Sequence, residues 1–333
     1  MKPTKIRPGA RAILSVLVFS AFSISSSSAC LWDRDTVAME KSRFPEASNV
    51  ITGNFPRHSK EFHQWRIEKT RKELEKDPKQ LPLYDDLAVS QHKLGDHTAA
   101  CETMKAKELI QPGIYETYSN MGTFLIYTGD LPKALDFINK ALSINPQAHF
   151  GREQYQKWLV EWVIAGKPIQ TERPVVPEKL EVSPFGYSAF VLSKQPITAR
   201  KDMTAALRQE AIRGILGMMR FADYGNPILQ EALGDLLCTG KFETNATHLA
   251  SLAYLQASQN ATAPEETARL RKKFDIARST FMDGEKPAPL ELELKKANAK
   301  GEQLAASIRK DELAWIAGGK DASAEFTRKY LVP

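Results

Sequence analysis

Cysteine is scarce in this sequence, with only Cys30, Cys101 and Cys238 among 333 residues. So few thiols exclude a small disulfide-stapled scaffold, and no C-x-x-C pair is present to suggest a redox or zinc-finger motif. Cys101 and Cys238 lie among small apolar residues in helical patterns. We therefore predict two buried free thiols. A disulfide between them stays an alternative, because the sequence does not give its geometry.

The sequence also lacks the motifs that mark common active sites. It contains no H-E-x-x-H, G-x-S-x-G, G-x-G-x-x-G or Walker A pattern. Asp33 and Asp35 are paired carboxylates, but their place near the N-terminus favours a solvent-exposed tail over acid–base chemistry. The histidines show no metal-ligand spacing; they are His58, His63, His92, His97, His149 and His248. We predict no catalytic residue, no metal and no cofactor, with an enzyme of dispersed active site as the alternative.

No hydrophobic run is long enough to span a bilayer comfortably, which takes about 20 residues. The apolar run Ala12–Ile24 follows four basic residues and precedes the small residues Ser25–Ala29. This order is typical of a secretory signal peptide, which we place at residues 1–29. An uncleaved N-terminal anchor is the alternative. The protein is expected to be exported, to the periplasm, the cell envelope or the extracellular space, in an arrangement typical of bacteria.

Cys30 directly follows the predicted leader. Ser28-Ala29-Cys30 resembles the end of a bacterial lipoprotein box, although Ser27 stands where that box usually has Leu. Lipidation at Cys30 is therefore an alternative to ordinary cleavage. Contact with a membrane is expected only if Cys30 is lipidated or the N-terminus is uncleaved.

The formal net charge of +6 does not indicate a nucleic-acid partner. Lys2, Lys5, Arg7 and Arg11 all lie in the leader, where no acid offsets them, and the rest of the chain is close to neutral. We predict no nucleic-acid binding.

An internal repeat is the clearest positive feature of the chain. Residues 84–88 match residues 118–122 in type, Gly95-Asp96 match Gly129-Asp130, Ala100 matches Ala134 and Pro112 matches Pro146. All these pairs share one separation of about 34 residues. Within each copy the apolar residues recur at helical intervals, the Gly-Asp pair ends one helix and caps the next, and the proline closes the unit.

The two copies resemble consecutive tetratricopeptide repeats, at about residues 81–114 and 115–148. The family pattern appears as Tyr84, Leu87, Ala88, Gln91, Ala100, Met104 and Pro112, and again as Tyr118, Met121, Gly122, Leu125, Ala134, Ile138 and Pro146. Gln91 and Met104 depart from the family's aromatic preference, and Lys107 replaces the small residue found at Ala141. The resemblance implies an all-α fold of antiparallel helix pairs stacked as a solenoid.

Other patterns define the rest of the first half. A helix is predicted over Ser59–Lys76, with Ser59 as N-cap, and another over Gly151–Ala165, so that residues 59–166 form one helical domain. Residues 30–58 are expected to be an extended N-terminal segment. The proline-rich residues 167–200 are expected to connect two helical halves, with Phe185–Leu192 as a short strand or packed loop.

A second helical half is predicted over residues 201–333. A degenerate repeat fits residues 227–264, with Leu233-Gly234, Leu237 and Gly240 in its first part and Ala250, Tyr254, Ala257 and Pro264 in its second. Further helices are expected over 265–281, Leu290–Ala317 and Ala322–Tyr330. The last two are expected to cap the stack, because repeat arrays need atypical ends to cover their final apolar face.

The resemblance implies a concave face, lined by the first helix of each repeat, that grips a peptide or a helix. The pattern places six residues there: Asp85, Val89, His92, Ser119, Thr123 and Ile126. An acid at Asp85 argues against a clamp for a peptide carboxylate. The leading hypothesis is a non-catalytic scaffold of the bacterial envelope or periplasm that binds a protein or peptide partner. A lipid-anchored structural component is the second hypothesis, and the oligomeric state stays open.

Overall fold

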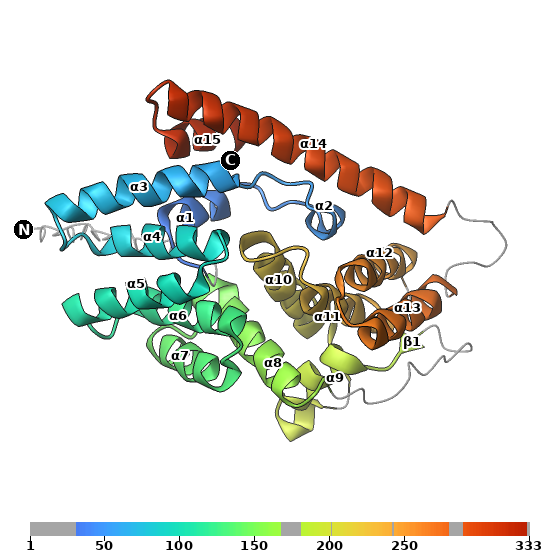
Figure 1. The fold of residues 1–333 in the computed structure, drawn as a ribbon. Coiled ribbons are helices and arrows are strands. Elements are labelled where there is room, and N and C mark those ends of the chain that lie inside the picture. The colour runs from blue at the N-terminus through green and yellow to red at the C-terminus, as the bar shows by residue number, and fades with distance from the viewer. Residues whose placement is uncertain (1–30, 168–180, 201, 242, 280–288, 332–333) are drawn as a thin grey trace, which may run out of the picture.

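The structure is a computed structural model that describes residues 31–167, 181–200, 202–241, 243–279 and 289–331. Within these ranges the chain is all-helical apart from one pair of two-residue strands (Figure 1). The predicted signal peptide and Cys30 lie outside the described residues. None of the described helices combines the length and apolar character needed to cross a lipid bilayer.

The first half consists of helices that each pack against the next one along the chain. These are α3 Lys60–Lys76, α4 Leu81–Lys93, α5 His97–Ile110, α6 Tyr115–Thr128, α7 Leu131–Ile144 and α8 Arg152–Ile164, with the 3-10 helix η1 Ala148–Gly151 before α8. The short connections between them make neighbouring helices run in opposite directions. The helices predicted over Ser59–Lys76 and Gly151–Ala165 are confirmed as α3 and α8.

Equivalent caps turn the chain between paired helices. Asp96 accepts a hydrogen bond from the Ala99 amide at 3.0 Å, and Asp130 accepts one from the Lys133 amide at 3.3 Å. Each aspartate thereby satisfies an amide that the first turn of its helix leaves unbonded. Gly129 ends α6 with a φ of 85°, a backbone conformation that favours glycine.

Small residues allow the paired helices to approach closely. A Cβ atom at Gly122 of α6 would lie 2.7 Å from Cγ1 of Ile138 in α7, so a larger side chain does not fit there without displacement. Ala88 of α4 is fully buried in the core between the repeats.

The second half contains α9 Gly186–Ser193, η2 Ile197–Ala199, α10 Ala205–Phe221, α11 Pro227–Leu237, α12 Thr244–Asn260, α13 Pro264–Ser279, α14 Leu290–Ala317 and α15 Ala322–Tyr330. Strand β1 (Glu181–Val182) pairs antiparallel with β2 (Gly240–Lys241). The helices predicted over Leu290–Ala317 and Ala322–Tyr330 are confirmed, and the helix predicted over 265–281 is α13. Cys101 and Cys238 are buried free thiols, as predicted.

Two local predictions are wrong. Residues 30–58 are not an extended segment, because they contain α1 (Arg34–Glu40) and α2 (Ala47–Ile51). Asp33 starts α1 by accepting a hydrogen bond from the Thr36 amide at 2.7 Å. Residues 186–192 are neither strand nor loop but lie in helix α9, and Phe185 is its N-cap. A 2.9 Å bond from the Phe185 amide to the Ser188 hydroxyl closes the first turn of this helix.

The two halves share one hydrophobic core. Tyr155 and Trp162 of α8 pack in the same cluster as Ile215 of α10 and Leu233 of α11. Helices α8 and α10 approach so closely that a Cβ atom at Gly214 would lie 2.9 Å from the Tyr155 ring. The proline-rich stretch therefore joins two halves that pack against each other directly.

Helix α14 does not simply cap the end of the second half, as the sequence suggested. It packs against α3 of the first half and α12 of the second, and it crosses above both in Figure 1. A Cβ atom at Gly301 would lie 2.7 Å from the Thr52 carbonyl oxygen, so this glycine sets how closely α14 approaches the chain after α2.

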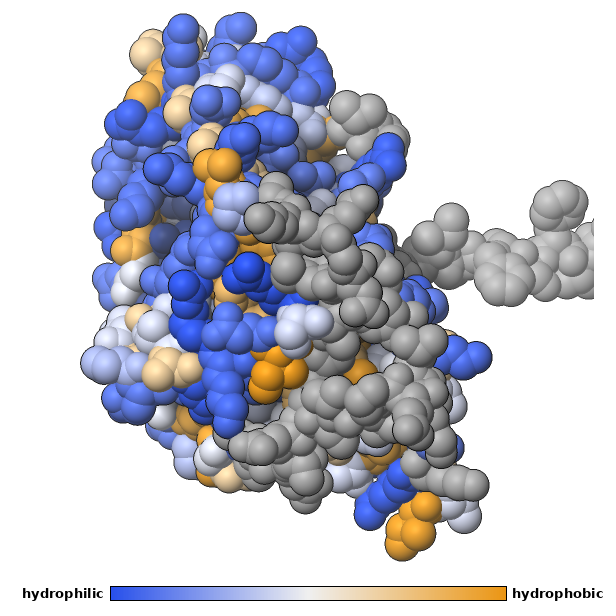
Figure 2. Space-filling view, turned by 90° about the vertical axis from the view of Figure 1, so that its right-hand side faces the viewer, coloured by the Kyte–Doolittle hydropathy of each residue, from blue (hydrophilic) through white to orange (hydrophobic). Residues whose placement is uncertain are grey.

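The surface seen in Figure 2 is largely hydrophilic where the described residues are visible. Apolar residues appear there singly or in small groups. On this face the described surface therefore offers no broad apolar patch.

Candidate functional site

The side of helices α4 and α6 that faces the N-terminal segment holds residues of the same chain. The Oδ1 atom of Asn120, on α6, accepts a hydrogen bond from the Trp32 amide at 2.8 Å, and its Nδ2 donates to the Trp32 carbonyl at 2.9 Å. The Oδ1 atom of Asp86, on α4, accepts a bond from the Arg34 amide at 3.1 Å. We call Asp86 and Asn120 the backbone clamp, because both bind main-chain groups of residues two apart, Trp32 just before α1 and Arg34 at its first position.

A buried chain of polar groups orients Asn120. Its Nδ2 also donates to Oδ1 of Asp85 at 3.1 Å, and both Asp85 oxygens accept bonds from the Lys107 ammonium, at 2.8 and 2.6 Å. Burial raises the pKa of Asp85 to about 7, while the Lys107 charge opposes the rise. With its amide nitrogen directed in this way, Asn120 presents its oxygen to the N–H of Trp32 and its nitrogen to the C=O of the same residue.

Ion pairs fix the rest of the N-terminal segment. Arg66 of α3 contacts the carboxylates of both Asp33 and Asp35, the former at 2.6 Å, and all three side chains are buried. Burial acts to raise the pKa of Asp33, but Arg66 and the Thr36 amide outweigh it, so this pKa lies below its usual value. The expectation that Asp33 and Asp35 form a solvent-exposed tail is therefore wrong. The reason is a cation on another helix, Arg66, that the local pattern does not reveal.

This polar cluster extends to helix α14. Glu312 of α14 contacts Nδ1 of His58 at 2.6 Å and accepts a bond from the Ser59 amide at 2.9 Å. The His58 ring stacks on Phe62 at a centroid distance of 3.7 Å. The start of α3 is thus held by a residue that is about 250 positions away in the sequence.

The six predicted partner-binding residues do not form one exposed surface. Asp85, Val89, His92 and Ser119 are between 0 and 5% exposed. Their prediction as an accessible surface is wrong, because residues 31–40 and the second half cover the inner side of α4 and α6. Thr123 and Ile126 instead line an apolar pocket at the junction of the two halves.

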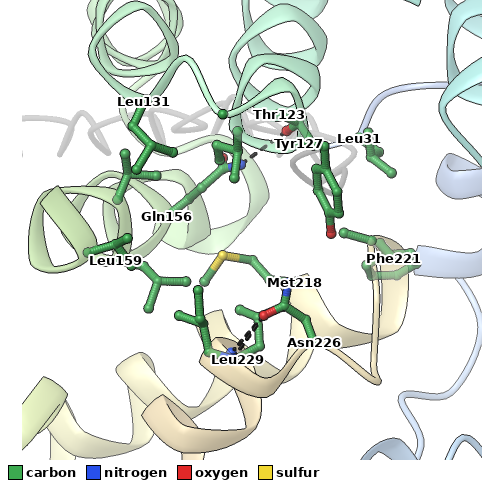
Figure 3. A pocket seen from close by; sticks show the side chains of 16 residues that line it. Leu31, Thr123, Tyr127, Leu131, Gln156, Leu159, Met218, Phe221, Asn226 and Leu229 are labelled. Carbon is green, nitrogen blue, oxygen red and sulfur yellow. Dashed lines mark hydrogen bonds between the residues drawn. The ribbon is translucent and has the colours of Figure 1, made fainter. Parts of the chain in front are cut away.

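This junction pocket has a volume of about 320 Å³. Figure 3 shows side chains from α6, α8, α10 and α11 directed toward the same space, with Leu31 beside it. Most of its 16 lining residues are apolar, and none of the described residues that line it is charged. Its polar members include Gln156, which donates to the Thr123 hydroxyl at 3.0 Å, and Tyr127. The pocket therefore suits an apolar group rather than an ion.

Sequence reasoning missed the residues of the backbone clamp. Asp86 and Asn120 occupy the same position in the two repeats, next to Asp85 and Ser119. The sequence does show one signal, a hydrogen-bonding side chain at the same place on α4 and on α6. The prediction did not use it, because it assigned the concave face to neighbouring positions of these helices.

The part of the chain that the structure describes contains no group of three or more His, Cys, Asp or Glu side chains that could hold a metal ion. Comparison of the sequence with protein-family models finds no match, and comparison with curated proteins finds none either. The geometry of the site is therefore the basis for the function proposed below.

Proposed function

We propose that this protein is an exported, non-catalytic scaffold that binds an extended segment of a partner protein. In this proposal helices α4 to α7 are two tetratricopeptide-like repeats, and the backbone clamp of Asp86 and Asn120 is the partner-binding site. The stacked helix pairs, their equivalent caps and the shared repeat position of the two clamp residues support it.

The observation that carries the proposal is the paired contact between Asn120 and the main chain of Trp32, at 2.8 and 2.9 Å. Contacts to backbone groups give affinity for an extended chain of any sequence, while side-chain pockets give specificity. The Asp86 contact to Arg34 repeats this arrangement one helix pair earlier, at 3.1 Å. Two such contacts, two residues apart, suit a segment that is extended at its first residues and then begins a helix, as Asp33 and Arg34 do.

The residues that contact the bound segment define the chemistry of the partner. Leu31 is buried among apolar residues of α4 and α6, Asp33 pairs with Arg66, and the Arg34 guanidinium pairs with Asp86. A partner that replaces this segment would carry an apolar residue, then an acid two positions later, then a base. In the state described here the chain's own residues 31–34 satisfy these contacts, so partner binding proceeds by exchange.

A labelled peptide with the sequence of residues 31–40 tests this directly. The wild-type chain, whose clamp is occupied, is compared with Leu31→Ala, which weakens the resident segment by roughly 2–5 kcal/mol but leaves the clamp intact. We expect the peptide to bind Leu31→Ala much more tightly than the wild type. Adding Asn120→Ala to Leu31→Ala should abolish the gain.

A second peptide, with Ala in place of Asp33, is the matched control for recognition by Arg66, and it should bind more weakly. Equal fluorescence anisotropy curves for all three protein variants would reject the proposal. The same three baits, crosslinked in envelope extract, would then show whether a natural partner follows the same order of recovery.

A further inference from the structure

The junction pocket is a second binding site, separate from the backbone clamp. We propose that it binds a single straight alkyl or acyl chain whose adjoining head group is uncharged. This inference concerns a lipid ligand and does not depend on partner binding at the clamp.

The size and lining of the pocket argue for an apolar chain. Its volume of about 320 Å³ exceeds that of an apolar cavity able to hold benzene, which is roughly 150 Å³. Leu159 of α8 faces Met218 of α10 and Leu229 of α11 across it. Since none of the described lining residues carries a charge, an ionised head group inside it would lose its hydration without a counter-charge.

The polar groups of the lining are few. The Nε2 atom of Gln156 donates to the Thr123 hydroxyl at 3.0 Å, and its Oε1 atom is buried. Figure 3 shows the Tyr127 ring, with its hydroxyl, projecting toward Phe221 at the edge of the pocket. The lining therefore matches the alkyl part of a ligand better than its polar part.

The chain itself provides one source of such a ligand. Leu31 lines the pocket, and Cys30 precedes it directly in the sequence. A lipid attached at Cys30 would therefore be joined to the residue next to one that lines the pocket. A free lipid from the membrane offers the same chain chemistry, so experiment must separate the two sources.

The test is calorimetric titration of the full-length Cys30→Ser chain, which cannot be acylated there, with hexanol, octanol and decanol. Each buried methylene should tighten binding about fourfold, so each step of two methylenes should give about fifteenfold. Val163→Phe, which fills part of the pocket, should weaken decanol binding at least tenfold. Ile197→Phe makes a similar increase in size at a residue that is 82% exposed, and it should have no effect.

Circular dichroism checks that Val163→Phe and Ile197→Phe are folded. Binding that ignores chain length, or that is the same in the parent and in Val163→Phe, overturns the proposal.

The source is decided with the wild-type chain purified from membranes. If mass spectrometry shows an acyl group on Cys30 and decanol binds Cys30→Ser but not the wild type, the tethered chain fills the pocket. If both proteins bind decanol and a neutral lipid co-purifies without a covalent bond, the ligand is a free lipid. If neither binds any alcohol, the pocket is not a lipid site.

Discussion

Replacing Asn120 with alanine should release the N-terminal segment while the helical repeats stay folded. The substitution removes both bonds to the Trp32 main chain, at 2.8 and 2.9 Å, and the 3.1 Å bond to Asp85. The Asn120 side chain makes no contribution to a helix cap, so the effect is expected to be confined to the segment and its immediate neighbours.

The size of the effect follows from the hydrogen bonds. Each of the two bonds to Trp32 contributes about 1 kcal/mol net, and a main-chain group left buried without a partner costs about 1–3 kcal/mol. The closed position of residues 31–36 should therefore lose about 2–4 kcal/mol. Since 1.4 kcal/mol corresponds to about tenfold in population, the segment should open roughly 100-fold more often.

Amide hydrogen exchange measures this opening residue by residue. Amides of residues 32–36 should exchange roughly 100-fold faster in Asn120→Ala than in the wild type, whereas amides in the middle of α5 and α7 should be unchanged. Asn145→Ala is the matched control, because Asn145 is an exposed residue at the end of α7. Unchanged exchange in residues 32–36, or equally faster exchange throughout the first half, would refute the clamp.

Three further predictions concern stability, each measured by urea unfolding. Burial raises the pKa of Glu153 to about 7, so the protonated form of this side chain favours the folded state. Its contribution to the free energy of unfolding, about 3 kcal/mol, is present in full below about pH 4.5 and should be lost as the pH rises through about 7. Glu153→Gln should flatten this part of the pH profile. Arg66→Leu leaves Asp33 and Asp35 buried without their cation and should lower the free energy of unfolding by about 3–5 kcal/mol at neutral pH. Adding Asp33→Asn and Asp35→Asn should restore most of this loss. No recovery would contradict the ion-pair explanation. Gly122→Ala places a Cβ atom 2.7 Å from Cγ1 of Ile138 and should destabilise by about 1–3 kcal/mol. This loss should be smaller in an Ile138→Ala background, which lacks Cγ1. A neutral result would show that α6 and α7 separate easily.

The sequence by itself determined the helices and their order. The apolar period, the caps at Ser59, Asp96 and Asp130, and the stops at proline and glycine are local signals, and each acts within about one helical turn. The limits of α14 and α15 were therefore predictable to the residue.

Local signals failed where the conformation depends on distant partners. Residues 30–58 look polar and turn-rich, yet Asp33 and Asp35 become buried because Arg66 of α3 neutralises them. No residue close to Asp33 in the sequence indicates that this cation will lie beside it. A buried acid and an exposed acid look the same until the opposite charge is placed beside them.

The candidate site was decided only by the tertiary structure. The sequence indicated that α4 and α6 share an inner surface, but it could not show that residues 31–34 lie across it or that Asn120 binds their main chain. The junction pocket needs Leu31, Ile126 and Leu229, which are brought together only when the two halves pack. Helix periodicity fixes which face of a helix is apolar, whereas the partner of that face depends on contacts between segments far apart in the chain.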